Sequence, residues 1–359
     1  MKRLLAALTL AALTATGAAA QNLWTPEFGV QGGFARVKPA GTGASDHQDL
    51  FSIPGLSLSS ALPSPATLFF IVPASARLAI EPSFAAAAIT DATGGELDLV
   101  SLGARADYAI TPHLYAAAGA GLNYSSGLAD NEAQFGLQAA LGYRTALTGT
   151  LNGRIEAQWS TWGKTDNIDP YNVYALALGV STRLGARPGA PARRATRPGL
   201  WRPVIGVAGG YAKTHFVGES DLAAFTAPGI TSLLASAGAS VPPTLFAIVP
   251  LGGRWALEPG FDLVRAQSGG TTTTAGQLQA RLDYAFDAHW YGAAGVQLLY
   301  VRRTGQDAAT NFAGNVAGGY RFPLVGELGG RVELNYYMTR ASDDFTAVVA
   351  NGASNTFGV

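Results

Sequence analysis

Apolar and polar residues alternate strictly in one eight-residue stretch that occurs twice in the chain. Residues 77–84 read RLAIEPSF and residues 254–261 read RWALEPGF, so the second copy begins 177 residues after the first (254 − 77). In an extended strand, successive side chains point to opposite faces. One face of each copy therefore carries an arginine and a glutamate, and the other carries large apolar residues and a proline. The pattern predicts a two-faced β-strand in each half of the chain.

The rest of the sequence follows the same repeat. A glycine-rich strand is predicted at 28–35 and again at 205–212, and the segments that follow each copy predict seven more strands. The copy of the eighth strand begins at Asn355-Thr356-Phe357 and is several residues shorter than its counterpart at 172–180. Long loops at 39–64 and 217–242 alternate with short turns such as 111–113 and 287–289. Eight strands per half, joined alternately by long loops and short turns, are typical of a barrel that crosses a membrane.

The orientation of the apolar face distinguishes two fold classes. A soluble sheet buries its apolar face, whereas a transmembrane barrel turns that face to lipid and its polar face to the lumen. Forty-five glycines among 359 residues and only 13% charged residues do not fit a typical helical or α/β enzyme. We predict an all-β protein: two tandem eight-stranded antiparallel, up-and-down transmembrane barrels. The alternative is one sixteen-stranded barrel.

The boundaries of the predicted domains follow from where the two copies of the repeat begin and end. Residues 1–20 have two basic residues, an apolar run and a small-residue cleavage site, which together predict a secretory signal peptide. The first repeat occupies 21–185 and the second 200–359. The segment 186–199 between them is rich in Pro, Gly and Arg and predicts a linker on the side of the short turns.

Charged residues recur at fixed places on the polar faces of the predicted strands. Buried charges are tolerated when balanced partners surround them, so we expect a network of ion pairs that fills each narrow lumen. A conductive or ligand-gating role is the alternative. The predicted members are Arg77, Glu81, Arg105, Asp107, Arg154, Glu156, Arg254, Glu258, Arg281, Asp283, Arg331 and Glu333.

The sequence offers little support for catalysis. The chain has no cysteine, and His113 and His289 occupy the same turn in both repeats, which indicates a role in the turn. His47 lies in an acidic loop without a second histidine at ligand spacing. Arginines lie near Glu81 and Glu156, so both carboxylates are expected to stay ionised. We predict no catalytic residue, no metal site and no cofactor, and the zero net charge suggests no nucleic-acid partner.

Aromatic residues at strand ends or on the apolar faces are the expected lipid-interface girdles. They are Trp159, Tyr143, Tyr124, Trp290, Tyr320, Tyr336 and Phe261.

The signal peptide, the eight-strand repeat and these girdles resemble the small outer-membrane β-barrels of Gram-negative bacteria, of the outer-membrane protein A, X and W types. The resemblance implies an outer-membrane location, with the lipid bilayer, lipopolysaccharide and the barrel-assembly machinery as partners. It implies a structural or surface-interaction role, with the long loops as the contact surface. The alternatives are a passive porin built as one larger barrel and a membrane-embedded lipid-modifying enzyme, for which His47 and Ser57 would be the residues to test.

Overall fold

The computed structural model of the chain describes residues 23–40, 47–53, 68–91, 96–127, 131–147, 151–184, 200–216, 221–226, 243, 245–325, 328–340 and 354–358. The predicted signal peptide and the predicted linker lie outside these residues. All regular elements in the described part of the chain are β-strands, which confirms the all-β prediction. The described residues contain no helix that is long and apolar enough to cross a membrane.

The first half of the chain forms a closed antiparallel barrel. Its strands are β1 (Glu27–Pro39), β2 (Gln48–Ile53), β3 (Leu68–Pro73), β4 (Leu78–Asp91), β5 (Glu96–Ala109), β6 (Leu114–Ser126), β7 (Glu132–Ala146), β8 (Leu151–Trp162) and β9 (Tyr171–Arg183). Each strand from β3 to β8 pairs with the next, β9 pairs with β1, and the first part of β1 pairs with β3. At the end of the short turns, eight of the described strands therefore close a ring.

The second half repeats this order with two changes. Its strands are β10 (Val204–Val207), β11 (Gly210–Phe216), β12 (Leu222–Thr226), β13 (Leu245–Gly252), β14 (Trp255–Ser268), β15 (Thr271–Ala285), β16 (Trp290–Arg303), β17 (Ala309–Val325), β18 (Leu328–Thr339) and β19 (Ser354–Gly358). β10 and β11 together take the place of β1. The described β19 pairs with β11 and with residues 335–339 of β18, and Asn355 takes the position that Asn172 has in the first half.

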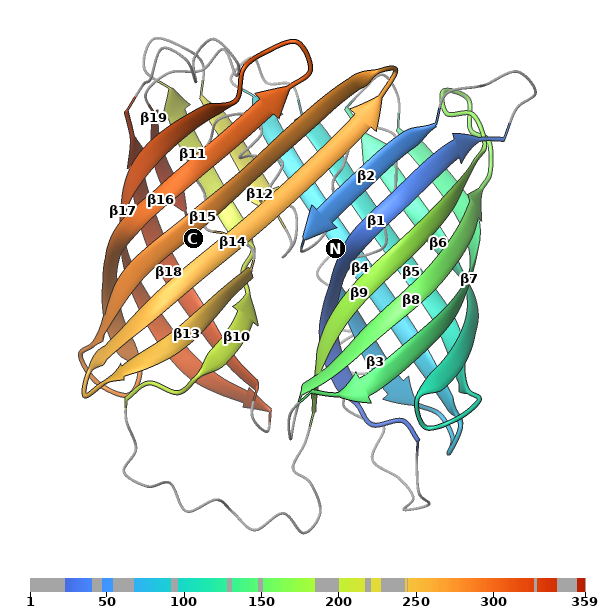
Figure 1. The fold of residues 1–359 in the computed structure, drawn as a ribbon, viewed down its shortest axis with the longest axis horizontal. Coiled ribbons are helices and arrows are strands. Elements are labelled where there is room, and N and C mark those ends of the chain that lie inside the picture. Colours follow the sequence, from blue (N-terminus) through green and yellow to red (C-terminus); the bar gives the residue numbers. More distant parts are fainter. Residues whose placement is uncertain are drawn as a thin grey trace.

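At the end of the molecule that carries the long loops, strands of one half pair with strands of the other. β2 lies between β1 of its own half and β14 of the other, and β12 lies between β11 and β4 in the same way. The register is the same in both exchanges. Gly33 of β1 is opposite Ser52 of β2, and Ser52 is opposite Val264 of β14. In the same way, Gly210 of β11 is opposite Thr226 of β12, and Thr226 is opposite Ala87 of β4. Gly33 and Gly210 are 177 positions apart, and so are Ala87 and Val264. The exchange therefore relates the halves by an approximate two-fold symmetry (Figure 1).

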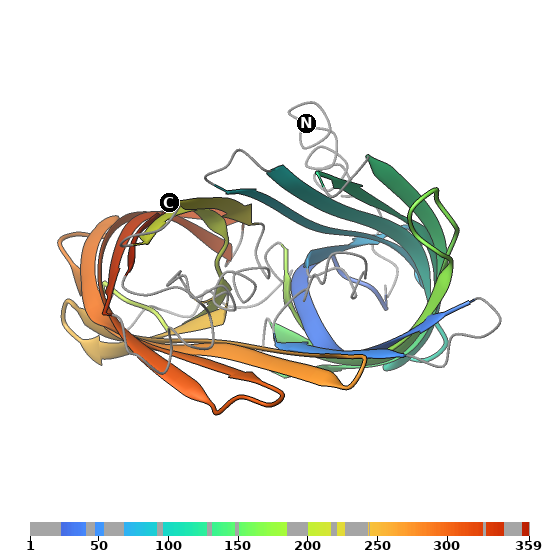
Figure 2. The same ribbon diagram turned by 90° about the horizontal axis from the view of Figure 1, so that it is seen from above.

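The two ends of the molecule consequently differ in strand number. At the long-loop end, the described strands form one continuous ring of sixteen: β1, β2, β14 to β19, β11, β12 and β4 to β9. Figure 2 shows the two lobes side by side, with strands running between them. The short-turn end of the first half therefore has the ring of eight expected of a small barrel, and the long-loop end has the ring of sixteen expected of one large barrel.

The strand faces have the orientation of a transmembrane barrel. Along β15, residues from Gln277 to Asp283 are alternately buried and exposed, and the buried ones are polar or charged while the exposed ones include Leu278 and Leu282. In the repeated stretch, Glu81 is 1% exposed and Ile80 is 41% exposed. Polar side chains thus fill the interior and apolar side chains cover the outside, as the sequence pattern predicts.

The exchange of strands can be tested by disulfide cross-linking, because the chain has no cysteine of its own. Leu50 of β2 is directly opposite Ala266 of β14, and Thr90 of β4 is opposite Ala223 of β12. Opposite residues of antiparallel strands have Cα atoms about 4.5–5.5 Å apart, within disulfide reach. We expect Leu50→Cys/Ala266→Cys and Thr90→Cys/Ala223→Cys to cross-link after mild oxidation.

The readout uses a protease site inserted into the predicted linker. After cleavage and heating, each cross-linked pair should migrate at full length on a non-reducing gel. The matched control combines one cysteine from each seam, Leu50→Cys/Ala223→Cys, and should separate into two halves. Separation of the directly opposite pairs would contradict the exchange.

Candidate functional site

A cluster of ion pairs fills the lumen of the first half near the short turns. Arg105 of β5 lies 3.0 Å from a Glu81 oxygen and its Nε lies 3.0 Å from Asp107. Arg105 also donates to both oxygens of Glu156. Arg154 of β8 donates to both oxygens of Glu81. All five side chains are buried, so the charges of this cluster face one another rather than water. Its three carboxylates outnumber its two guanidinium groups by one.

The second half contains the same cluster. Arg281 Nε lies 3.0 Å from Glu258 and 3.1 Å from Asp283, and its terminal nitrogens donate to Glu333 at 2.5 and 2.6 Å. Arg331 donates to both oxygens of Glu258. The clusters are therefore two copies of one arrangement, in which three carboxylates surround two guanidinium groups.

The strand register brings these charges together. Glu81 and Arg105 are directly opposite on β4 and β5, as are Glu258 and Arg281 on β14 and β15. Directly opposite residues of an antiparallel pair point to the same face, with Cβ atoms about 4.5–5.5 Å apart. A salt bridge between them follows from the pairing alone. Arg154 and Arg331 reach the same glutamates from across the lumen.

A tyrosine completes each cluster, and its packing explains one of the many glycines. Tyr115 donates its hydroxyl to Glu156, and Tyr291 donates to Glu333 at 2.5 Å. Each ring lies on a glycine of the next strand: a Cβ atom at Gly142 would come within 2.2 Å of the Tyr115 ring, and one at Gly319 within 2.4 Å of the Tyr291 ring. These strand glycines are needed for close packing inside the barrel.

Two predicted members of the network are not part of it. Arg77 and Arg254 are exposed and lie in the turns just before β4 and β14 begin, so alternation along the strand does not apply to them. Their carbonyl oxygens accept hydrogen bonds from the indoles of Trp24 (2.9 Å) and Trp201 (2.8 Å). The prediction that Arg77 and Arg254 belong to the lumen network is therefore wrong. The structure brings the other ten predicted residues together in the two clusters.

Aromatic side chains lie beneath and beside the guanidinium groups. Arg154 lies 3.4 Å from the centroid of the Phe69 ring, and Arg331 lies 3.8 Å from that of Phe246. This geometry adds a cation–π contact to each cluster.

Closer to the turns, Arg144 lies over Trp24 at 4.4 Å and Arg321 over Trp201 at 3.9 Å. Sequence reasoning did not assign these four residues, although the repeated Gly-Tyr-Arg and Leu-Trp segments mark them. Each pair places a guanidinium group on a buried indole near the short turns.

A layer of polar contacts around Glu27 has no counterpart among the described residues of the second half. Glu27 is 1% exposed, accepts hydrogen bonds from Asn152 at 2.9 Å and Ser181 at 2.5 Å, and lies 3.6 Å from Arg144. The positions 177 residues after Glu27 and Asn152 are Val204 and Gly329. The two halves therefore share a charge cluster but differ in the residues around it.

The histidines do not form a site in the described residues. His113 and His289 stack on tyrosines in equivalent turns, and His47 is exposed, 3.7 Å from Asp49. In the second turn, Asp287 accepts backbone N–H bonds from His289 and Trp290, and these bonds lower the pKa of Asp287 below its ordinary value. The described residues contain no group of side chains able to hold a metal ion. Ser57 lies outside them.

The chain is similar to several solved structures at low identity. No family model matches the chain, and no curated protein matches it. Among solved structures, the attachment invasion locus protein Ail of Yersinia pestis is 18% identical over 45% of this chain and 99% of that chain, with a TM-score of 0.24. The CymD monoaromatic hydrocarbon channel is 10% identical over 98% and 90%, with a TM-score of 0.29.

A Pseudomonas aeruginosa FadL homologue is 10% identical over 93% of this chain and 88% of that chain, with a TM-score of 0.25. At these identities and TM-scores, the similarities carry no information about the ligand or activity of this chain.

Proposed function

We propose that this chain is an outer-membrane β-barrel protein with a structural or surface-interaction role, that its lumen does not conduct solutes, and that it catalyses no reaction. The observation that carries the proposal is the pair of buried ion-pair clusters. Each cluster, together with its aromatic side chains, occupies the lumen near the short turns. In this proposal the short turns face the periplasm. The predicted loops 39–64 and 217–242, apart from the wall strands β2 and β12 that lie within them, form the external contact surface.

The apolar exterior supports the membrane location. Leucine, valine, phenylalanine and tryptophan side chains on the outward faces of the strands remain more than a third exposed, Leu137, Leu334 and Phe312 among them. A soluble protein rarely leaves so much contiguous apolar surface in water. In a bilayer, the same surface is the one that contacts acyl chains.

Planar-bilayer recording tests the proposal. The purified full chain, refolded and shown by its heat-sensitive gel mobility to be folded, should insert without a steady conductance of porin size. A general porin reconstituted in the same way serves as the positive control. The ring of sixteen strands at the long-loop end is the feature that favours the porin alternative, and a steady porin-sized conductance from the folded chain would establish that alternative.

A further inference from the structure

Two arginines lie in one row across the wall of the second half, near the long loops. Arg265 of β14 is directly opposite Thr274 of β15, and Thr274 is directly opposite Arg302 of β16. Figure 1 shows these three strands next to one another. Neighbouring strands are about 4.7–4.9 Å apart, so the backbones that carry the two arginines are about 10 Å apart. Both guanidinium groups can therefore reach one group held over Thr274.

The neighbours of this row along each strand show that its side chains point away from the lumen. They belong to one buried apolar cluster inside the wall and are Val264, Ala275 and Val301. Successive side chains of a strand point to opposite faces, so the three residues of the row lie on the outer face. Both arginines of the row are exposed there.

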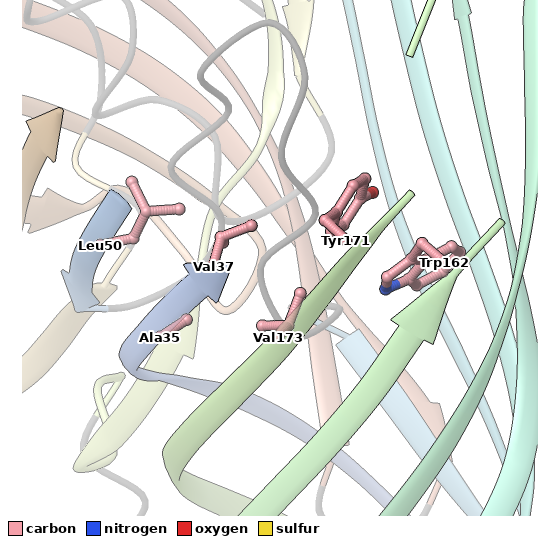
Figure 3. Close-up of a cluster of buried hydrophobic side chains, with 6 residues drawn as sticks. All are labelled: Ala35, Val37, Leu50, Trp162, Tyr171 and Val173. Atoms are coloured by element: carbon pink, nitrogen blue, oxygen red, sulfur yellow. The ribbon is translucent and has the colours of Figure 1, made fainter. Parts of the chain in front are cut away.

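The exchanged strand β2 continues this wall on the other side of β14. Figure 3 shows the buried side chains of this part of the wall, among them Ala35, Val37 and Leu50. The residues that alternate with them point outward, and there Arg36 donates to both oxygens of Asp49 at 2.7 Å. The carboxylate of β2 is thus already paired. The two arginines of the row have no ion-pair partner among the described residues.

The row lies at the border of the apolar outer face. Towards the short turns, the next two outward rows of the same strands are Leu263, Gly276 and Tyr300, and then Phe261, Leu278 and Leu298. Thr274 is about 13 Å along the strand from Leu278, or about 10 Å along the membrane normal at a strand tilt of about 40°. Half the height of the apolar band of a membrane barrel is about 12 Å. The arginine side chains can therefore reach the lipid headgroups while their stems cover apolar surface.

The first half has different residues in the equivalent row. There Ala88 of β4 is opposite Asp98 of β5, and Asp98 is opposite Ser126 of β6. Ser126 donates a hydrogen bond to Asp98 at 3.4 Å. Two positive charges in the second half thus take the place of one negative charge in the first. The barrel forms with either set, so the fold itself does not require the two arginines.

We propose that Arg265, Thr274 and Arg302 bind the phosphate group of a membrane lipid in the leaflet on the long-loop side. Guanidinium groups form paired, charge-assisted hydrogen bonds to phosphate oxygens, and the threonine hydroxyl can donate one more. A lipid fits this site better than a soluble anion, because the apolar rows beside it would contact the acyl chains. The inference rests on the proposed membrane location and names a lipid partner for it.

Native mass spectrometry of the full folded chain in detergent, titrated with dioleoyl phosphatidic acid, tests this site. Dioleoyl phosphatidylcholine has the same acyl chains but carries a choline group on its phosphate, so it measures the acyl contacts alone. We expect phosphatidic acid to bind about tenfold more tightly than phosphatidylcholine, or better. The double variant Arg265→Ala/Arg302→Ser, which introduces the residues of the first half, should lose this preference and keep its affinity for phosphatidylcholine.

Two further variants keep the test decisive. Thr274→Asp retains both arginines but introduces the acid of the first half, and it should also lose the preference for phosphatidic acid. Arg77→Ala/Arg254→Ala removes the same charge at the short turns and should retain the preference. Glycerol 3-phosphate at the concentration of the lipid should not displace it, because it has no acyl chains.

The proposal is wrong if the folded native chain binds the two lipids equally, if a folded variant of the row keeps the preference, or if the short-turn variant loses it. Displacement of the lipid by glycerol 3-phosphate would show a site for a soluble anion and would also overturn the proposal. A folded chain that binds neither lipid would contradict the proposed membrane location as well, whereas equal binding of both lipids would leave that location standing.

Discussion

Replacing Glu81 by alanine should destabilise the barrel by on the order of 3 kcal/mol, because it leaves two buried arginines with fewer partners. Arg105 and Arg154 both contact this carboxylate, and Glu81 is 1% exposed. Water cannot reach the site to replace the hydrogen bonds that the two guanidinium groups lose. The equivalent change in the second half, Glu258→Ala, removes the partner of Arg281 and Arg331 and should have an effect of the same size.

Urea unfolding of the refolded protein in lipid vesicles measures this loss, with gel mobility as the indicator of the folded state. The matched control is Arg77→Ala, in the exposed turn before the same strand. Its effect should stay within about 0.5 kcal/mol, the usual range for an exposed site. Equal stability of Glu81→Ala and the native chain would show that the ion pairs do not hold the barrel together.

An arginine at Leu278 should cost about 2–4 kcal/mol, the value for a charge on the lipid face near the middle of a bilayer. Leu278 is the central residue of β15, points outward and is 55% exposed. In a soluble protein, a leucine this exposed could be replaced by arginine with almost no effect. The substitution therefore distinguishes lipid from water at the outer face.

Leu251→Arg is the control, because Leu251 is 56% exposed but lies at the end of β13 beside a short turn. Near the interface, an arginine on the lipid face costs only about 0–1 kcal/mol. Unfolding of both variants in vesicles should show the larger loss at Leu278. If the two variants are equally stable, the outer face of β15 does not lie in the hydrocarbon core.

Alternation and repetition in the sequence were sufficient to predict the strands and the direction of their faces. Side chains two apart on a strand share a face, which is why Arg105 with Asp107 and Arg281 with Asp283 could be placed in the lumen. The same rule fails for Arg77 and Arg254, because it applies only to residues that belong to a strand. Both lie in turns, where no alternation exists.

The exchange of strands between the halves could not be predicted from the sequence. β2 and β12 are short, and their partners β14 and β4 are distant in sequence, so no local pattern specifies the pairing.

The central claim is that the apolar faces of the strands contact lipid while the charges meet inside. Site-directed spin labelling along β15 tests it directly, since single cysteines at Leu278, Ala280 and Leu282 would be the only ones in the chain. In vesicles, labels at these three positions should collide with oxygen and be shielded from a water-soluble nickel chelate, whereas a label at Ala288 in the turn should show the reverse. Free access of the nickel chelate to all four positions would contradict the account.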